Sequence, residues 1–238
     1  MSVELFLSEN CADIWLGDEI KVHCTRFNRD HYQDCFYEHL GVEFPDQMNK
    51  SVIKRRAEYL AGRYCALNAL SEIGIKNYQI QTGEHRAPIW PDGILGSISH
   101  NDNFAIAAIS KRHNLCGIGV DVEEVMSTVT VNNVMSQILN KEEELLISTL
   151  DPENIEKWFT AFFSAKESFF KAAYSEVKSY FGFDAVTIKH VDIEKSTLQL
   201  KLNTFLSTSL EEYEHFQVSF RHIGANKILT FIKIPSLR

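Results

Sequence analysis

Hydrophobic side chains recur at helical spacing in four stretches of the chain. The clearest is 46–73, where apolar residues repeat every three or four positions and share one helical face: Ile53, Ala57, Leu60, Tyr64 and Leu67. Gly74 follows directly and suits the end of such a helix. The other helices are predicted over 31–40, 131–148 and 153–177.

Alternating or continuous apolar runs between these helices predict strands. Residues 223–227, which include Gly224 and Asn226, suit a hairpin turn, and the proline-containing segment 83–93 is predicted as an ordered loop. The predicted strands are 3–7, 21–27, 75–82, 94–99, 104–110, 115–123, 185–191, 197–202, 216–223 and 228–234.

The order of these elements predicts an α+β fold with an internal duplication. Strands, a long helix and strands are followed by helices, a long helix and strands, so each half is a long helix packed on an antiparallel sheet. We place the halves at 1–114 and 115–238 and expect one compact unit, because no Gly/Ser-rich or Pro-rich linker divides the chain. No repeat is visible residue by residue, so the duplication rests on element order alone.

Composition and charge narrow the class of protein. The chain has 238 residues, of which 45% are hydrophobic and 24% charged, as in globular proteins and unlike disordered chains. Its formal net charge of −8 argues against a general nucleic-acid binder. The five cysteines form no C-x-x-C pair, the N-terminus lacks a signal-peptide pattern, and no apolar run approaches the ~20 residues of a membrane span. We therefore expect a reduced, cytoplasmic protein without a transmembrane segment or a cysteine-based zinc site.

The segment 117–124 is an apolar strand that ends in carboxylates. Asp121 and Glu123 are two residues apart, so on a strand they share one face. Two carboxylates on one face repel each other unless a positive charge lies between them, and oxygen ligands suit Mg²⁺, which also takes substrate phosphates. For so short a pattern alone, an exposed acidic strand end is the more common explanation.

A second segment, 162–171, carries four phenylalanines within a predicted helix. Glu167 and Lys171 are four residues apart and share one helical face. The simple explanation is a surface ion pair, which contributes only a few tenths of a kcal/mol. The close apolar surroundings instead favour a glutamate that completes a metal site, with a lysine near the charge of a phosphate.

A third segment, 96–102, places small polar residues and a histidine at the end of an apolar strand. Ser99 and His100 can bind a phosphate or stack on a base, although a capped turn with a structural histidine is the simpler explanation for this segment alone. No Gly-x-Ser-x-Gly elbow is present, so Ser99 beside His100 does not indicate a catalytic triad.

The fourth group is basic. Arg56 and Arg63 are seven residues apart on the predicted helix 46–73 and share a face, which is as readily a solvated surface as a binding site. Lys54 and Arg55 lie beside them. Arg86, in the predicted loop, is a candidate for gripping a phosphate through its guanidinium fork.

Five motifs that follow one another between residues 61 and 171 resemble one family. They are Ala61-Gly62-Arg63, Arg86-Ala87-Pro88-x-Trp90-Pro91, Gly96-Ser97-Ile98-Ser99-His100, Gly117-Ile118-Gly119-Val120-Asp121-Val122-Glu123 and Phe163-Ser164-Ala165-Lys166-Glu167-Ser168-x-x-Lys171. This succession covers nearly half of the chain. It resembles the 4′-phosphopantetheinyl transferase superfamily, in its larger single-chain form and closest to the enterobactin-synthetase component D branch.

The resemblance implies a fold of two similar α+β halves that mimic a dimer, with the active site in the cleft between them, and therefore a monomer. It implies transfer of the phosphopantetheine arm of coenzyme A to a serine of an apo acyl or peptidyl carrier protein, with release of 3′,5′-ADP. It also implies Mg²⁺ as cofactor. The N-terminal half would contain the coenzyme A-binding segments and the C-terminal half the metal-binding carboxylates.

The same resemblance implies roles for individual residues. Asp121, Glu123 and Glu167 match the metal ligands, and Glu167 is also the leading candidate for general base. Lys171 matches the lysine on the pyrophosphate, and with Asp121 and Glu167 it forms the catalytic set. The expected coenzyme A contacts are Arg56, Arg63, Arg86, Ser99, His100, Asp121 and Lys171.

Some positions depart from the family pattern or align loosely with it. Arg86 stands where many members have lysine in a Gly-Lys-Pro loop, and Phe163 stands where many have tryptophan. Lys54 or Arg55 is a further candidate for a basic contact. The carrier is expected to dock on an apolar or basic patch, for which residues 126–135 and the helix after them are candidates.

Two other functions stay open on the sequence. A Mg²⁺-dependent phosphohydrolase would share the three carboxylates, but it does not explain the Ser99–His100 segment or the Arg86 loop. A non-catalytic module that binds coenzyme A or carrier protein would not need all three carboxylates and Lys171. Fatty-acid, polyketide and nonribosomal peptide synthesis are all possible settings, and only the branch resembled favours siderophore-type peptide synthesis.

Overall fold

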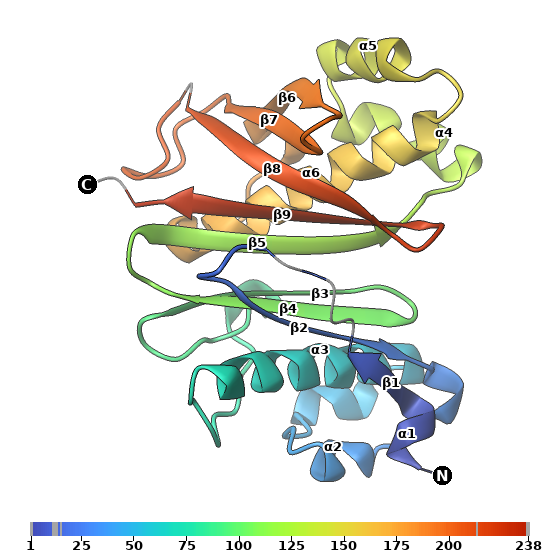
Figure 1. Cartoon of the computed structure of the whole chain (residues 1–238), viewed down its shortest axis with the longest axis vertical. Helices are drawn as coiled ribbons and strands as arrows, with labels where there is room; N and C mark the ends of the chain where they lie inside the picture. The colour runs from blue at the N-terminus through green and yellow to red at the C-terminus, as the bar shows by residue number, and fades with distance from the viewer. Residues whose placement is uncertain (1, 11–13, 15, 213, 237–238) are drawn as a thin grey trace. The chain divides into compact units, whose positions relative to one another are not determined.

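The structure is a computed structural model that describes residues 2–10, 14, 16–212 and 214–236. The chain divides into two units, Met1–Arg112 and His113–Arg238. The division falls two residues before the predicted boundary between 114 and 115. Each unit contains one long helix and one antiparallel sheet, as Figure 1 shows, which is the α+β arrangement predicted for each half.

The first unit has a four-stranded sheet in the order β1-β2-β4-β3, and all of its pairings are antiparallel. Its longest helix packs against this sheet (Figure 1). In chain order the elements are α1 (Val3–Phe6), β1 (Leu7–Asn10), β2 (Lys21–Phe27), η1 (Arg29–His31), α2 (Phe36–His39), η2 (Asp46–Lys50), α3 (Ile53–Glu72), η3 (Glu84–Arg86), β3 (Ile94–His100) and β4 (Phe104–Lys111).

Small side chains let helix α3 lie close to the sheet. Ala57, Ala61 and Cys65 are fully buried against it. At Gly62 a Cβ would lie 2.9 Å from the Ile98 side chain of β3, so glycine permits a close approach of helix and strand. That approach brings the side chains at the N-terminal end of α3 near the end of β3.

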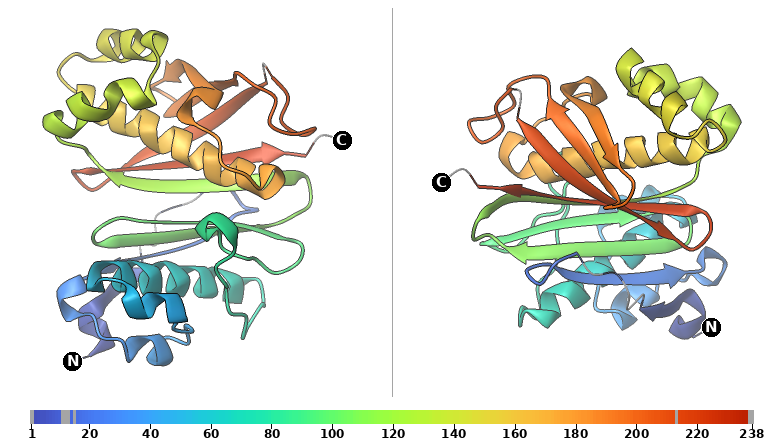
Figure 2. Two further views of the ribbon diagram at one scale, coloured as in Figure 1. Left: turned by 180° about the vertical axis from the view of Figure 1, so that it is seen from behind. Right: turned by 45° about the horizontal axis from the view of Figure 1, so that its top comes forward.

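The second unit has a five-stranded antiparallel sheet in the order β5-β9-β8-β7-β6. Figure 2 shows its longest helix lying along one face of the sheet, with two shorter helices beside it. In chain order the elements are β5 (Leu115–Glu124), α4 (Thr128–Ile138), α5 (Lys141–Leu150), α6 (Ile155–Val177), η4 (Phe183–Ala185), β6 (Val186–Asp192), β7 (Thr197–Leu202), β8 (His215–Ile223) and β9 (Lys227–Pro235).

Strand β5 and helix α6 meet backbone against backbone. A Cβ at Gly117 would overlap the carbonyl oxygen of Ala172, and one at Gly119 would overlap that of Ser168. No larger residue fits at either position without moving the helix. Asp121 follows Gly119 by two residues on the same face of the strand, so it meets the same helix.

Most predicted elements are confirmed. Strands β2 and β7, the three strands around residues 94–124, the long helix α6 and the hairpin at Gly224 lie where the sequence places them within a few residues. The prediction of one helix over 131–148 is wrong, because the chain leaves helical geometry at Leu139 and Asn140 begins a new helix. The Asn140 side chain accepts from the backbone N–H of Glu143, and the Glu143 side chain accepts from that of Asn140.

The other differences lie in the first unit. Residues 3–7 were predicted as a strand, but Ser2 caps a short helix there. Only η1 and α2 form within 31–40, and 46–73 divides into η2 and α3 at an extended Val52. Segment 75–82 is not a strand. It has a single bridge, from Thr82 to Pro88, and the carbonyl of Ile80 accepts from a side chain instead of from a neighbouring strand.

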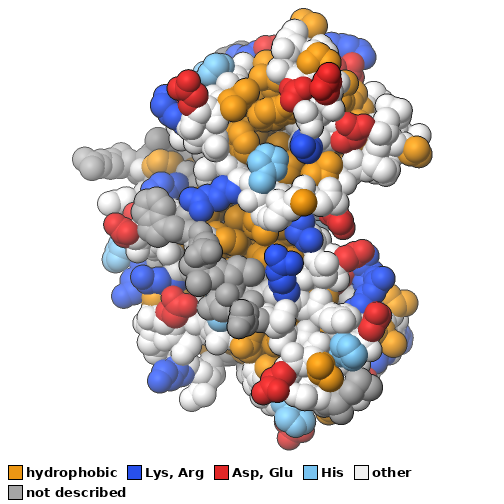
Figure 3. Space-filling view, turned by 45° about the vertical axis from the view of Figure 1, so that its right-hand side comes forward, with side chains coloured by type: hydrophobic (Ala, Val, Ile, Leu, Met, Phe, Trp, Pro, Cys, Tyr) orange, Lys and Arg blue, Asp and Glu red, His pale blue; other side chains and the backbone are white. Residues whose placement is uncertain are grey.

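Charges of both signs are interspersed on the face of the protein that Figure 3 shows, as the mixed composition leads one to expect. The described cysteines, Cys24, Cys35, Cys65 and Cys116, form no disulfide, and Cys11 lies outside the described residues. Within the described part of the chain, no helix combines the length and the apolar character that crossing a bilayer requires.

Replacing Gly119 by alanine tests the contact between β5 and α6. The added methyl group has to push the Ser168 carbonyl away, so we expect the free energy of unfolding to fall by about 1–3 kcal/mol. Thermal unfolding measures the change. Gly83→Ala is the matched control, since the nearest atom there belongs to the flexible Ile89 side chain. A Gly119→Ala protein as stable as the control would contradict the contact.

Candidate active site

Asp121 is a buried carboxylate of the second unit that hydrogen bonds hold at both oxygens. Its Oδ1 accepts from Lys171 Nζ at 2.7 Å, and its Oδ2 accepts from Ser164 Oγ at 2.8 Å. Ser164 and Thr230 are in turn linked by hydrogen bonds between their side chains and from Thr230 Oγ1 to the Ser164 carbonyl. Strand β9 and helix α6 therefore fix the orientation of this carboxylate together.

Lys171 supplies the positive charge next to Asp121. Its ammonium also donates to the Val120 carbonyl at 3.2 Å, and about a quarter of the side chain stays exposed. An ammonium held at the edge of a buried carboxylate, with one side open to solvent, can still reach an anionic substrate.

Glu123 and Glu167 complete a group of acids around this pair. Burial, followed by the negative charge of Asp121, raises the pKa of Glu123 to about 8, while Lys171 opposes the shift. Burial and Asp121 likewise raise the pKa of Glu167, again opposed by Lys171. The structure thus brings together the four residues of the second unit that the sequence singles out, two from β5 and two from α6.

This group fits a hard divalent cation in charge and in donor type. Three carboxylates and one ammonium leave two negative charges when all are ionised, and every donor is an oxygen. Among the described residues, no three acidic, histidine or cysteine side chains are already grouped tightly enough to hold a metal ion. Mg²⁺ is usually held by one or two carboxylates together with water and substrate phosphates, so a site of this kind does not need a complete protein cage.

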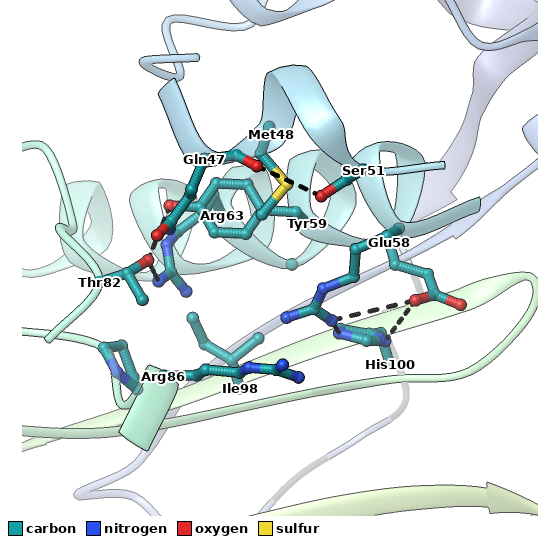
Figure 4. Close-up of a pocket in the computed structure, with 13 residues that line it drawn as sticks. Gln47, Met48, Ser51, Glu58, Tyr59, Arg63, Thr82, Arg86, Ile98 and His100 are labelled. Atoms are coloured by element: carbon teal, nitrogen blue, oxygen red, sulfur yellow. Dashed lines mark hydrogen bonds and ion pairs between the residues drawn. The ribbon is translucent and has the colours of Figure 1, made fainter. Parts of the chain in front are cut away.

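A cavity of about 380 Å³ lies in the first unit, against the face of α3. Figure 4 shows Arg63, Glu58 and His100 around it, with Arg86 reaching across from the η3 turn. The complete lining is Gln47, Met48, Ser51, Arg55, Glu58, Tyr59, Gly62, Arg63, Thr82, Arg86, Pro88, Ile98 and His100. Three arginines outnumber the one acid of this lining, Glu58, so the charge of the cavity suits an anionic ligand.

Arg63 and Arg86 line the cavity in different ways. Arg63 is buried; its Nε donates to the Ile80 carbonyl and its Nη2 to Thr82 Oγ1, so it also fixes the following loop. Burial lowers the pKa of its guanidinium. Arg86 is exposed and forms no ion pair with any described residue, so its charge is available to a ligand.

The backbone presents Arg86 through an unusual turn. His85 and Arg86 both have positive φ, 52° and 66°, in the left-handed region that most side chains avoid. Trp90 secures the loop, because its indole packs where a Cβ at Gly96 of β3 would lie.

Two of the coenzyme A contacts predicted in the first unit do not line this cavity. Arg56 donates to Asp34, to the Asn49 carbonyl and to the Ser51 carbonyl, and so ties α3 to the segment before it. Its neighbour Arg55 lines the cavity instead. Ser99 is buried on the face of β3 opposite to His100, because successive side chains of a strand alternate.

Sequence reasoning missed Glu58, Tyr59 and Thr82 in the cavity wall. The signal for Glu58 was present: it lies three residues after Arg55 and four before Gly62, which is the spacing of one helical face. Thr82 had no such signal, since its position depends on the loop that Arg63 holds.

Lys166 has a structural role although it directly precedes Glu167. Its buried ammonium donates to the Ile138 carbonyl, to Glu143 Oε2 and to the Phe183 carbonyl, at 2.9–3.1 Å. Burial lowers the pKa of Lys166, and Glu143 opposes that shift. This buried pair joins α6 to the junction of α4 and α5, away from Asp121.

The comparisons with known proteins cover most of the chain. A family model described as the 4′-phosphopantetheinyl transferase N-terminal domain matches residues 44–110, and one for the 4′-phosphopantetheinyl transferase superfamily matches 117–230. Enterobactin synthase component D of Salmonella typhimurium is 33% identical over 80% of this chain and 77% of its own. The 4′-phosphopantetheinyl transferase Npt of Nocardia iowensis is 34% identical over 68% of this chain and 70% of its own.

Among solved structures, a holo-(acyl-carrier-protein) synthase from Bacillus anthracis in complex with CoA (3′,5′-ADP) covers 52% of this chain and 100% of its own, at 19% identity. Its TM-score of 0.41 is too low to carry an argument. The family models and the relatives identify this protein as a transferase. The chain belongs to the 4′-phosphopantetheinyl transferase superfamily, which confirms the predicted family and enzyme class.

Replacing Lys166 by alanine should lower the free energy of unfolding of the protein, in addition to any effect on the reaction rate. The change leaves Glu143 as an uncompensated buried charge, which costs about 3–5 kcal/mol. Chemical denaturation at neutral pH measures the loss. Lys157→Ala, in the exposed first part of the same helix, is the control and should stay near the wild-type value. Equal stability of the two variants would show that the buried pair has no such role.

Replacing Glu123 by glutamine should stabilise the metal-free protein. A carboxyl whose pKa is raised on folding contributes stability at low pH, and that stability is lost as the pH rises from about 4 to about 8. The neutral amide avoids this loss, so we expect a gain of about 1–3 kcal/mol at pH 8.5 and almost none at pH 4. Melting temperatures in the presence of a chelator measure both.

Glu124→Gln is the matched control for that change. Glu124 is the next residue of β5 and is exposed, with a hydrogen bond from Asn226. A Glu123→Gln protein that gains no stability relative to this control at pH 8.5 would contradict the repulsion among the acids.

Proposed function

We propose that this chain transfers the 4′-phosphopantetheine arm of coenzyme A to a serine of an apo carrier protein, with release of 3′,5′-ADP, and that Mg²⁺ supports the reaction. The observation that carries the proposal is the buried Asp121, which is bonded to Lys171 and flanked by Glu123 and Glu167. A group with this charge and these donors suits a metal-bound pyrophosphate.

The cavity of the first unit supports coenzyme A as the substrate. The nucleotide end of coenzyme A carries a 3′-phosphate as well as the pyrophosphate, and Arg55, Arg63, Arg86 and His100 line the cavity. Planar guanidinium groups bind phosphate oxygens through paired hydrogen bonds. We infer that this cavity takes the 3′-phosphoadenosine end of coenzyme A.

The protein's own residues account for the movement of charge. Asp121, Glu123 and Glu167 would hold Mg²⁺, which when bound makes the β-phosphorus of coenzyme A more electrophilic. The serine Oγ attacks that phosphorus, and the bond to the oxygen that bridges the two phosphates breaks. Glu167 is the candidate general base that accepts the serine proton. Lys171 donates to the departing phosphate, where negative charge develops.

The carrier is proposed to be an acyl or peptidyl carrier protein. The relatives named enterobactin synthase component D favour a peptidyl carrier of siderophore synthesis. The predicted docking region falls on α4 and α5, beside a hollow lined by Met126, Val134, Ile138, Phe163, Tyr180 and Phe183. Helix α4 contains no charged residue, so docking there would depend on apolar contact. The monomeric state remains a prediction.

The Asp121→Asn variant tests the proposal by intact mass. Wild-type protein with coenzyme A and Mg²⁺ should add one phosphopantetheine group to an apo carrier protein and lose this activity in chelator. Asp121→Asn keeps the shape of the side chain but removes its charge, so transfer should fall at least 100-fold while the protein stays folded. Glu194→Gln, in the exposed turn between β6 and β7, is the control and should stay fully active.

Other outcomes separate the alternatives. Full transfer by Asp121→Asn would contradict the assigned role of the carboxylate. Cleavage of the coenzyme A pyrophosphate without a carrier would favour the phosphohydrolase, and binding of coenzyme A without turnover would favour a binding module.

A further inference from the structure

Three side chains at one end of the cavity in the first unit form a continuous chain of polar contacts. Arg55 Nη1 lies 3.2 Å from His100 Nε2, and His100 Nδ1 lies 3.8 Å from Glu58 Oε2. Arg55 Nη1 also lies 4.0 Å from Glu58 Oε2, which closes the triangle. Figure 4 shows the contact between His100 and Glu58 as a dashed line.

The fold brings the triangle together through local spacing. Arg55 and Glu58 are three residues apart on α3 and so lie on the same side of the helix. Gly62, one turn further on, lets α3 approach Ile98, and His100 is two residues from Ile98 on the same face of β3. The histidine therefore lies against the first turns of the helix.

The contact between Arg55 and His100 is a hydrogen bond in only one tautomer of the histidine. A guanidinium only donates hydrogen bonds, so Nε2 has to be the acceptor. In that tautomer the ring proton lies on Nδ1, which faces the Glu58 carboxylate. This form of the ring is neutral, and it becomes a cation when Nε2 gains a proton.

A carboxylate in a cavity for anions needs an explanation, because it repels the ligand directly. Only 11% of the Glu58 side chain is exposed. Burial raises its pKa, and the positive charges of Lys54 and Arg55 oppose the shift. Simple repulsion would predict that this acid weakens anion binding. The contact with His100 indicates a different role for Glu58, because a carboxylate stabilises a neighbouring imidazolium.

The other charged groups around His100 come from every element packed near it. Lys54 and Arg55 lie on α3, Asp102 follows β3 and pairs with Lys54, and Arg86 lines the same cavity from η3. Arg29 of η1 acts on Glu58 at longer range. Among these described groups the cations outnumber the acids, and Glu58, whose Oε2 lies 3.8 Å from His100 Nδ1, can compensate a positive charge on the ring.

We propose that Glu58 is a positioning residue for the 3′-phosphate of coenzyme A: it orients His100 and stabilises its imidazolium form, so that binding of the phosphate is accompanied by uptake of one proton at Nε2. The phosphate takes the donors of Arg55, and the newly protonated Nε2 donates to it as well. Glu58 thereby favours ligands that carry this phosphate over those that lack it. The inference rests on the proposed function for the identity of the ligand.

Calorimetric binding of 3′,5′-ADP and of 5′-AMP tests this without any turnover. At pH 8, in buffers of different ionisation enthalpy, wild-type protein should take up about one proton with 3′,5′-ADP and none with 5′-AMP. Glu58→Gln should bind 3′,5′-ADP about tenfold more weakly and take up no proton, while its affinity for 5′-AMP is unchanged. Glu72→Gln, at the exposed end of α3, is the control and should behave as wild type.

Each other result overturns the inference. Tighter binding of 3′,5′-ADP by Glu58→Gln would show that the acid only repels the ligand. Equal loss for both nucleotides would show a general structural role, and absence of proton uptake in the wild type would exclude the coupling even if the variant fails to fold. A protein that passes this test but modifies no carrier would leave the inference standing and refute the transfer reaction.

Discussion

The close approach of strand β5 to helix α6 is the contact on which the chemistry of the second unit depends. Gly117 and Gly119 have no side chains, and the carbonyls of Ala172 and Ser168 occupy the space that side chains would need. This contact sets the distance between the strand that carries Asp121 and Glu123 and the helix that carries Glu167 and Lys171. A wider separation would break the Asp121–Lys171 hydrogen bond and leave a buried acid without a partner.

The same contact creates an electrostatic cost among the ionised acids that a proton or a bound cation relieves. Three acids share the space around one ammonium, and both Glu123 and Glu167 are held above their ordinary pKa. A cation that binds the ionised acids removes this cost, so binding is favoured by the charge that destabilises the free protein. The cavity of the first unit has an excess of positive charge instead. Its lining contains one acid, Glu58, and three arginines, Arg55, Arg63 and Arg86.

The sequence predicted the regular elements well because helical and strand periodicity depend on local spacing. The sequence-based predictions were wrong where tertiary contacts determine the backbone conformation. Ile80 forms no strand because Arg63 takes its carbonyl, and helix 131–148 breaks because Asn140 caps a second helix. At the site, Glu167 and Lys166 are adjacent, but only the helix geometry shows that Lys166 points to Glu143. Strand alternation alone, applied to β3, would have separated Ser99 from His100, whereas the capture of Arg56 by Asp34 required the folded chain.

Binding of Mn²⁺, followed by electron paramagnetic resonance in the presence of coenzyme A and without a carrier, tests most directly whether these acids form a metal site. The account predicts one bound ion per wild-type chain, with the affinity reduced at least tenfold in Asp121→Asn and unchanged in Glu142→Gln. Coenzyme A binds the ion weakly by itself, and the comparison between the two variants removes that contribution. Equal affinity in wild type and Asp121→Asn would contradict the account, because the buried acid beside Lys171 would then have no part in holding the metal.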